Sequence, residues 1–466
     1  MDILMPVTEL LPYVKVGGLS DVAAALPKTL RAAGHKVTLV LPKYAAFESS
    51  GLLMARRLTP IPVKLGDRTH EVVVYDGRLP SQVDLVLVDA PGMFDRAGVY
   101  GERGEDYPDN ATRFALLSKA TAEIVKQRGE AGSPVDVVHC HDWPTALVPR
   151  YLAELGVDVP TVLTIHNLAH QGVFPKDVLP LLGLGWDDFK VDGIEFYGGI
   201  NLLKLGILTA TALTTVSPNY AREILTSERG ERLDGVLGAR KDKLTGVLNG
   251  VDYAVWNPAT DSALAARYDA EGFGNKGRCK GALQKELGLP LDPHAPVVAC
   301  VGRMVAQKGT DLVADAIGPL LRQSDAQIVI AGDGDHALVK RVSAEIEKSR
   351  GRAVFVQAAA EQVVHRIFAG ADLALVPSRY EPCGLVQMYA QRYGALPVAR
   401  ATGGLVDSIV DCDGTTVQAN LVNTVADTDH VRLGMPVRLV TWSMGTDAND
   451  DEGVGFGFEP IEGSAA

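Results

Sequence analysis

Two glycine pairs stand where a phosphate group could bind. The first is in "KVGGLSDV" (15–22), between a predicted strand at 3–7 and a predicted helix; the second is in "TGGLVDSI" (402–409), which also follows a strand pattern and precedes a helical one. Glycine lets the backbone approach a ligand, and a helix N-terminus offers unpaired N–H groups. Each stretch alone could equally be a tight turn. The two together favour one anion-binding loop in each domain, which suits a diphosphate, and Lys15 adds a mobile ammonium.

Two cations follow another predicted strand. The stretch "VGRMVAQKG" (301–309) contains Arg303 and Lys308 just past an apolar run. Fixed positive charges there could neutralise a diphosphate leaving group, where electrostatic catalysis gains most. The alternative is an ordinary solvated loop.

Histidines and polar groups end two further strand patterns, "VVHCHDW" (137–143) and "TIHNLAHQG" (164–172). If these strands are neighbours, one set of side chains converges: His139, His141, Asp142, His166, Asn167 and His170. A zinc site is weakly supported, because no thiolate and no third ligand at regular spacing accompany the His-x-His pair. Hydroxyl recognition and proton handling fit this cluster as well as a zinc site or better, and we expect at most two or three of its members to be chemically important.

The predicted loop "SRYEPCGL" (378–385) contains a carboxylate, Glu381, where the chain passes from loop to helix. Glu381 could accept hydrogen bonds from sugar hydroxyls or stabilise a cationic transition state, or it could simply place a negative charge at a helix N-terminus. Gly384 allows close backbone approach. Cys383 has no evident base beside it and is interpreted as a packing residue.

These motifs must be positioned by an α/β fold. Nearly continuous apolar runs, typical of strands buried on both faces, alternate with helical patterns at 19–32, 110–128, 309–322 and 336–349. The strand patterns lie at 36–42, 83–89, 135–140, 160–166, 212–217, 296–302, 326–332, 353–357, 373–378 and 396–400. A change in composition near 245 predicts two domains, 1–245 and 246–466, with a cleft between them. The polar, weakly periodic segment 410–452 is predicted to be a long loop or a partly ordered insert.

Bulk properties narrow the classes of function. The formal net charge of −12 argues against nucleic acid and anionic membrane as partners. Five scattered cysteines without a Cys-x-x-Cys pair argue against a disulfide framework and a zinc site. The N-terminus has no basic stretch of a signal peptide, and no apolar run is long enough to span a membrane. A cytoplasmic protein is expected.

Seven motifs, in their order along the chain, resemble those of bacterial glycogen synthases and plant starch synthases. They are "KVGGL", "HCHDW", "TIHNLAHQG", "VLNGVD" (247–252), "VGRMVAQKG", "SRYEPCGL" and "ATGGLVDS". The resemblance covers residues 1 to about 410. It implies a GT-B fold, with two Rossmann-like parallel-sheet domains facing a central cleft. It also implies transfer of glucose from ADP-glucose to the non-reducing end of an α-1,4-glucan such as glycogen, with retention and without a metal ion or other cofactor.

The resemblance also implies roles for individual residues. Catalysis would involve Glu381, Asp142, His166, Arg303 and Lys308, with the two cations on the diphosphate and with His166 and Asp142 on the sugar and acceptor side. Substrate binding would involve Lys15, Gly17, Gly18, Asn249, Cys383, Gly384, Leu385, Thr402, Gly403 and Gly404. Of these, the first three would form the donor-phosphate loop and Thr402–Gly404 would add backbone donors.

Two departures from the family pattern leave an alternative open. Ala358–Ala360 stand where an aromatic residue usually lies against the nucleotide base, and helices that usually follow the final "GFGF" are not recognisable before residue 466. The alternative is therefore a non-catalytic or impaired glucan- or nucleotide-binding protein. An oxidoreductase is disfavoured, because no Gly-x-Gly-x-x-Gly follows a strand pattern.

Overall fold

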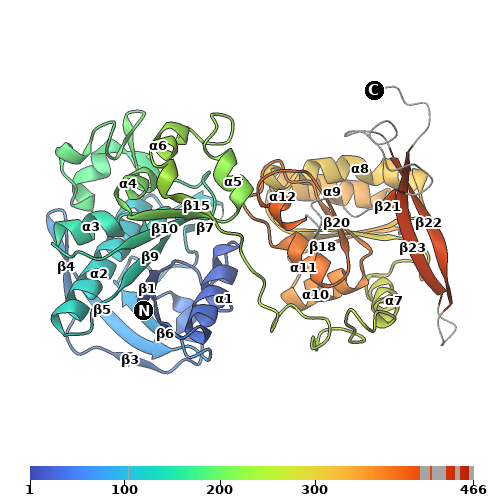
Figure 1. Cartoon of the computed structure of the whole chain (residues 1–466), viewed down its shortest axis with the longest axis horizontal. Helices are drawn as coiled ribbons and strands as arrows, with labels where there is room; N and C mark the ends of the chain where they lie inside the picture. The colour runs from blue at the N-terminus through green and yellow to red at the C-terminus, as the bar shows by residue number, and fades with distance from the viewer. Residues whose placement is uncertain (103, 410–419, 422–436, 447–451, 461–466) are drawn as a thin grey trace. The chain divides into compact units, whose positions relative to one another are not determined.

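The computed structural model describes residues 1–102, 104–409, 420–421, 437–446 and 452–460, which form two compact units (Figure 1). Unit 1 comprises Met1–Tyr253 with two later segments, Ser378–Leu385 and Arg400–Asp407. Unit 2 takes the described remainder, beginning at Ala254. The single boundary between residues 245 and 246 stays a prediction. The two later segments contain two of the predicted site motifs, so unit 1 brings them into contact with the N-terminal ones.

Unit 1 is built on a ten-stranded mixed sheet. Its parallel strands are, in spatial order, β15 (Leu244–Gly246), β14 (Ala212–Thr215), β10 (Thr161–Ile165), β9 (Val137–His141), β1 (Asp2–Pro6), β2 (Lys36–Pro42) and β6 (Asp84–Asp89). Antiparallel strands extend the β6 side: β5 (Arg68–Arg78), β3 (Met54–Arg56) and β4 (Ile61–Leu65). These three were not among the predicted strands. A smaller antiparallel sheet joins β11 (Val173–Pro175), β13 (Gly199–Asn201) and β12 (Glu195–Phe196).

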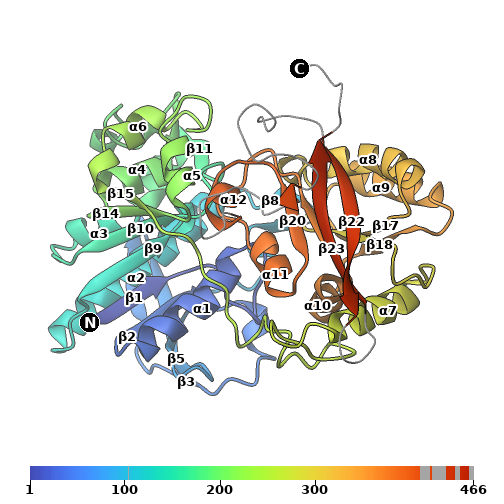
Figure 2. The same cartoon turned by 45° about the vertical axis from the view of Figure 1, so that its right-hand side comes forward.

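Helices cover both faces of the parallel part, as its continuous apolar strands require (Figures 1 and 2). Helix α1 (Leu19–Ala32) packs against β2 and buries Leu19, Ala23 and Pro27, one residue in every four. Helix α2 (Asn110–Glu130) packs against α3 (Val148–Glu154). The remaining helices of this part are α4 (Leu202–Thr209), α5 (Pro218–Glu223) and α6 (Asp234–Gly238).

The order of strands in unit 1 creates a switch point at β1. The chain continues from β1 to β2 on one side, whereas β9, much later in the sequence, pairs with β1 on the other side. Ligands of open α/β sheets bind beyond the carboxyl ends of the strands at such a point. The loop after β1 contains residues 7–18, and β9 leads directly into Asp142.

Unit 2 is a doubly wound domain with a five-stranded parallel sheet. The spatial order is β18 (Ala353–Gln357), β17 (Gln327–Gly332), β16 (Val297–Val301), β19 (Leu373–Val376) and β20 (Leu396–Ala399). Helices α8 (Thr310–Gln323) and α9 (His336–Glu347) lie on one face, and α7 (Asn275–Leu287) and α10 (Glu361–Gly370) lie on the other (Figures 1 and 2). Helix α11 (Val386–Arg392) precedes β20, whereas α12 (Gly404–Ser408), which follows β20 in the sequence, belongs to unit 1 up to Asp407.

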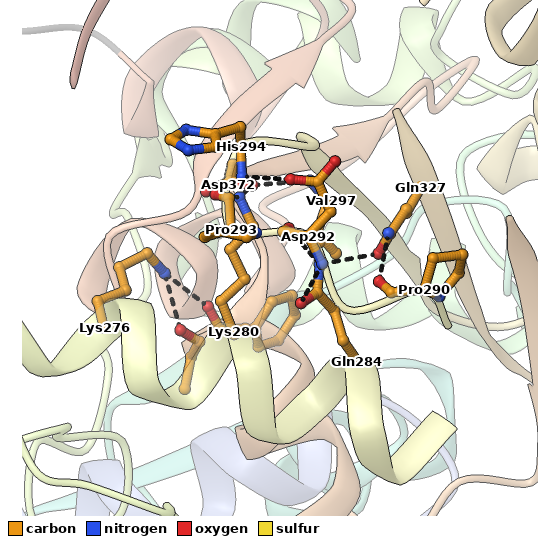
Figure 3. Close-up of polar contacts among 12 residues, drawn as sticks. Lys276, Lys280, Gln284, Pro290, Asp292, Pro293, His294, Val297, Gln327 and Asp372 are labelled. Atoms are coloured by element: carbon orange, nitrogen blue, oxygen red, sulfur yellow. Dashed lines mark hydrogen bonds and ion pairs between the residues drawn. The ribbon is translucent and has the colours of Figure 1, made fainter. Parts of the chain in front are cut away.

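Buried polar side chains fasten α7 to this sheet (Figure 3). The ammonium of Lys276 donates to the carbonyls of Phe368 and Ala369 at the end of α10, at 3.2 and 3.1 Å. Burial lowers the pKa of Lys276 to about 8. One helical turn on, Lys280 pairs with Asp372 at 3.0 Å. Because each buried amine has acceptors, α7 can carry lysines on its inner face.

The segment predicted as a loop is partly a sheet. β22 (Val437–Thr446) pairs antiparallel with β23 (Glu452–Pro460), and β21 (Asn420–Leu421) pairs with β23. Of the two alternatives predicted for 410–452, a long loop or a partly ordered insert, the loop is wrong over β22, whose Gly, Ser and Thr content hid the strand pattern. Most of the rest of that segment lies outside the described residues. In the part of the chain that the structure describes, no helix is long and apolar enough to cross a membrane.

Candidate active site

Glu9 organises the loop after β1. Its side chain is 4% exposed, and its Oε2 accepts hydrogen bonds from the main-chain amides of Val16 (2.8 Å) and Gly17 (2.7 Å). Its Oε1 accepts a hydrogen bond from the hydroxyl of Tyr100 at 3.0 Å. Burial raises the pKa of Tyr100 well above its ordinary value, so this hydroxyl keeps its proton. The buried carboxylate is thereby satisfied by three donors and fixes the shape of the first glycine motif.

Both glycines of the first motif leave room around them. A Cβ at Gly17 would meet no atom within 4 Å, and one at Gly18 would meet only Leu385 Cδ1, at 3.7 Å. Gly18 is the N-cap of α1 and is not bonded by a capping side chain. Lys15 lies beside this loop and forms an ion pair with Asp21 at 3.4 Å. Packing of the protein therefore does not explain why these two residues are glycine.

Asp142 and His166 lie at the carboxyl ends of neighbouring strands, β9 and β10. Oδ1 of Asp142 accepts a hydrogen bond from the main-chain amide of His166 at 2.7 Å. Burial raises the pKa of Asp142 to about 7, although amides of His166 and Asn167 oppose the shift. The backbone of Asp142 has φ 56° and ψ −174°, a region that is nearly exclusive to glycine. Strain of this kind is typical of functional positions, and the sequence carried no sign of it.

Three histidines meet beside this carboxylate. Nδ1 of His141 lies 2.9 Å from Nε2 of His166, and the rings of His139 and His141 have centroids 4.3 Å apart. Burial lowers the pKa of His139 to about 4 and that of His166 to about 3, and it also lowers the pKa of His141 well below its ordinary value. The convergence expected from neighbouring strands is therefore present, with neutral rings. His170 is exposed.

The second glycine motif packs against the protein itself. Gly403 has φ +50°, and a Cβ there would lie 1.9 Å from the carbonyl oxygen of Glu381. A Cβ at Gly404 would lie 2.4 Å from Cα of Cys383. The amide of Gly403 donates to Oε1 of Glu223 at 2.8 Å, and the amide of Gly404 donates to the carbonyl of Glu381 at 2.9 Å. These amides thus have protein acceptors, and their expected role as donors to a diphosphate stays a prediction.

An aspartate of this motif caps a helix. Oδ2 of Asp407 accepts hydrogen bonds from the hydroxyl of Ser217 and from the amide of Asn219, the latter at 2.8 Å. Ser217 is itself the N-cap of α5. Thr402, which precedes the glycines, is buried. The network fixes 402–407 on unit 1.

Glu381 is buried against the second glycine motif. Its side chain is 5% exposed and accepts a hydrogen bond from the hydroxyl of Ser378 at 2.9 Å. Burial raises the pKa of the Cys383 thiol to about 12, which supports its interpretation as a packing residue; hydrogen bonds from Asn249 oppose this shift. Asn249 is thereby placed next to Cys383. Gly384 has φ +73°, a left-handed conformation that favours glycine.

Arg303 and Lys308 belong to unit 2. Both follow β16, which pairs with β19 at the switch point of that sheet. Arg303 is exposed, and Lys308 ends a short 3₁₀ turn before Gly309, which has φ +67°. Among the described residues, no group of three or more His, Cys, Asp or Glu side chains is arranged to hold a metal ion.

Three acidic or phenolic groups in this site were missed by the sequence analysis: Glu9, Tyr100 and Glu223. Glu9 and Glu223 each hold the amide of the first glycine of a motif. An isolated glutamate many residues from its motif carries no periodic signal. Among the acidic residues around the two motifs, only Asp21 and Asp407 repeat in the sequence, each four residues after the first glycine.

Comparisons with known proteins agree with this arrangement. Residues 2–239 match the family model described as "Starch synthase catalytic domain", and residues 295–429 match "Glycosyl transferases group 1". The glycogen synthase of Anaeromyxobacter sp. (strain Fw109-5) is 45% identical over 421 residues, covering 89% of this chain and 86% of the relative. This chain belongs to the glycogen and starch synthase family. The family predicted from the seven motifs is confirmed.

Other members of the family give the same result. The glycogen synthase of Thioalkalivibrio sulfidiphilus is 43% identical over 417 residues, with 89% of this chain and 86% of the relative covered. A solved structure of the catalytic domain of Starch Synthase IV from Arabidopsis thaliana, bound to ADP and acarbose, matches with a TM-score of 0.81 and 33% identity, covering 89% of this chain and 86% of that one. The predicted fold class, α/β with two parallel-sheet domains of the GT-B type, is confirmed.

Proposed function

We propose that this chain is a glucosyltransferase that moves glucose from ADP-glucose to the non-reducing end of an α-1,4-glucan, with retention. The observation that carries the proposal is the match to glycogen synthases over 89% of the chain. The relative bound to ADP and acarbose supports a nucleoside diphosphate and a glucan-like acceptor as ligands. The space beside Gly17 and Gly18, at the switch point of unit 1, is consistent with a phosphate approaching the backbone there.

Each group of site residues has a part in this reaction. Lys15, Arg303 and Lys308 supply positive charge to the diphosphate as the bond between glucosyl C1 and the phosphate oxygen breaks. Glu381, Asp142 and His166 orient the sugar, whose C1 gains positive charge as that bond lengthens. The acceptor hydroxyl then bonds to C1 on the face that the phosphate leaves, and its proton passes to the departing phosphate oxygen.

The carboxylates that hold the loops are supporting groups in this account. Glu9 keeps the first motif in shape, so that the diphosphate meets a formed loop and not a flexible one. Asp142 has a pKa near neutrality, so its charge depends on pH in the working range. Asn249 and the stretch Cys383–Leu385 complete the substrate-binding set.

The test is incorporation of labelled glucose into glycogen from ADP-glucose and, in a parallel reaction, from UDP-glucose. We expect incorporation from ADP-glucose, into linkages that an α-1,4-specific hydrolase releases. Glu381→Gln should abolish it. Glu286→Gln, which removes a surface ion pair with Arg366, is the matched control and should not. A folded wild-type protein that incorporates no glucose from either donor would contradict the proposal and favour the non-catalytic alternative.

A further inference from the structure

His141 and His166 form a buried pair across two parallel strands. In the register of β9 and β10, His141 lies opposite Thr164, and His166 follows the end of β10. The distance from Nδ1 of His141 to Nε2 of His166 is 2.9 Å, which is a hydrogen bond between ring nitrogens. His141 is 1% exposed, whereas His166 is only partly buried. One imidazole is therefore enclosed, and the other is partly accessible to solvent.

The surroundings restrain His141 in one orientation. Its main-chain amide donates to Oγ1 of Thr145, whose hydroxyl donates back to the carbonyl of His141. The ring of His139 stacks beside it, and Nε2 of His139 is 2.7 Å from Oγ1 of Thr164. Oδ1 of Asp142 bonds the main chain of His166 and not its ring. The contact between the two imidazoles thus determines the protonation of both rings.

The pair contains one shared proton. Burial lowers the pKa of His166 to about 3 and that of His141 well below its ordinary value, and a second positive ring beside either would be repelled. Both rings are neutral at pH 7, and a neutral imidazole has one donor and one acceptor nitrogen. Either Nδ1 of His141 donates to Nε2 of His166, or the reverse.

The other nitrogen of His141 decides between the two. Within the described residues, Nε2 of His141 is buried and has no hydrogen-bond partner. If His166 were the donor, His141 would have to carry its own proton on Nε2, as a buried N–H without an acceptor. Buried N–H groups without acceptors are rarer in native proteins than unfilled acceptors. His141 therefore donates from Nδ1. Its Nε2 carries no proton, and a buried acceptor without a partner costs less free energy than a buried N–H without one.

The consequence falls on His166, which accepts at Nε2 and must carry its proton on Nδ1. We propose that His141 is a positioning residue that fixes His166 as the Nδ1–H tautomer, so that His166 presents an N–H donor to an oxygen of the bound glucosyl group. The ligand in this statement rests on the function proposed above; the tautomer does not. With the opposite tautomer, Nδ1 of His166 would be an acceptor, which could bind a sugar hydroxyl only when the hydroxyl donates and would repel a sugar oxygen that carries no hydrogen.

The first experiment reads the tautomer directly. Protein labelled with ¹⁵N in its histidine rings is examined by NMR at pH 8 without ligand, where protonated and bare ring nitrogens have well separated shifts. The chain has ten histidines, so the resonances of His166 are assigned as those missing from His166→Gln. We expect a protonated Nδ1 and a bare Nε2. A protonated Nε2 would overturn the proposal. The tautomer is read from the wild-type protein, and the variant serves only to assign its signals; if His166→Gln does not fold, His166→Asn provides the same assignment.

Variants then test whether His141 is the cause. His141→Leu removes the donor, and we expect His166 to shift toward Nε2–H. We expect kcat/KM for glucosyl transfer to fall about 10- to 100-fold, the range found for partners that orient metal-bound histidines. His141→Asn places an amide near the position of Nδ1 and should restore both the tautomer and most of the activity. His139→Gln is the matched control: it stacks on His141 but does not bond His166, so the tautomer of His166 should not change.

Two results distinguish this inference from the proposed function. If His141→Leu leaves the tautomer of His166 unchanged, the positioning role is wrong, whatever the activity. If the tautomer behaves as expected but wild-type protein transfers no glucose, the proposed function is wrong and the role of His141 in setting the tautomer stands.

Discussion

Residues 17–21 and 403–407 share the pattern Gly-Gly-Leu-x-Asp, and in each the amide of the first glycine donates to a glutamate, Glu9 or Glu223. Their surroundings differ. At 403 and 404 the positions of a Cβ are filled by the backbone of Glu381 and Cys383, whereas at 17 and 18 they are open or in ordinary contact. One pattern therefore serves two purposes: the second pair lets the protein pack on itself, and the first leaves space that a ligand can take.

The largest effect is expected from filling the second motif. Gly403→Ala requires a left-handed residue with a side chain and a shift of the Glu381 carbonyl, which together should lower the free energy of unfolding by about 2–4 kcal/mol. Denaturant unfolding measures this. Gly17→Ala should change it by less than about 0.5 kcal/mol, as expected where a Cβ meets nothing. Equal losses in the two variants would remove the distinction between the motifs.

The next largest effect is expected from a change at Glu9, the glutamate that holds the first motif. Glu9→Ala leaves two amides and the hydroxyl of Tyr100 without their acceptor, and should lower the free energy of unfolding by about 1–3 kcal/mol. It should also raise KM for ADP-glucose more than it lowers kcat, because the loop that we propose receives the donor loosens. Glu9→Gln retains an acceptor oxygen and should recover most of both. If Gln behaves like Ala, it is the charge of Glu9 and not its hydrogen bonds that matters.

Asp142 is the reverse of Gly17. Its backbone conformation is suited to glycine, yet the residue has a side chain. Asp142→Gly and Asp142→Ala both lose the bond to the amide of His166, so they differ chiefly in backbone strain. We expect the Gly variant to be the more stable of the two by about 1–2 kcal/mol, with glucosyl transfer lost in both. Thermal unfolding of the pair is the measurement, and equal stability would show that no strain is stored at this position.

The smallest effect concerns how the free energy of unfolding depends on pH through His139 and His166. The pKa values of His139 and His166 are lowered on folding, so the unfolded chain binds more protons between about pH 6.5 and 4. Their contribution to the free energy of unfolding is complete above pH 6.5 and is lost as the pH falls through this window. His139→Gln should make that decline shallower, by urea unfolding at pH 7 and pH 5. Asp142, with its raised pKa, acts in the opposite direction over the same window.

The parts of this structure that follow a repeating pattern were predictable. Helix α1 was expected at 19–32 and is Leu19–Ala32, and β2 was expected at 36–42 and is Lys36–Pro42. Both follow from burial, which a strand shows as a continuous apolar run and a helix shows as an apolar residue at every fourth position. β4 alternates buried and exposed residues over only five positions, too short to be distinguished from a loop. β22 is interrupted by small polar residues and was mistaken for one.

The candidate site divides in the same way. Residues inside a motif, such as Glu381, Asp142 and Gly403, could be found from the sequence. Glu9 and Glu223 could not, because they act through hydrogen bonds to amides that only the folded chain brings to them. The sequence also could not show why each glycine pair is glycine. It shows only that two glycines are adjacent; the packing around them shows whether protein backbone or open space lies beside them.

The most direct test of this account is the affinity of ADP for Gly17→Leu, measured by calorimetry beside the wild type, with denaturant unfolding as the control for folding. A leucine there meets no protein atom at its Cβ, so the fold should persist. We predict a stability close to that of the wild type and an affinity for ADP at least tenfold weaker, about 1.4 kcal/mol. Unchanged affinity in a stable variant would contradict it, because the space beside Gly17 would then not be where the nucleotide binds.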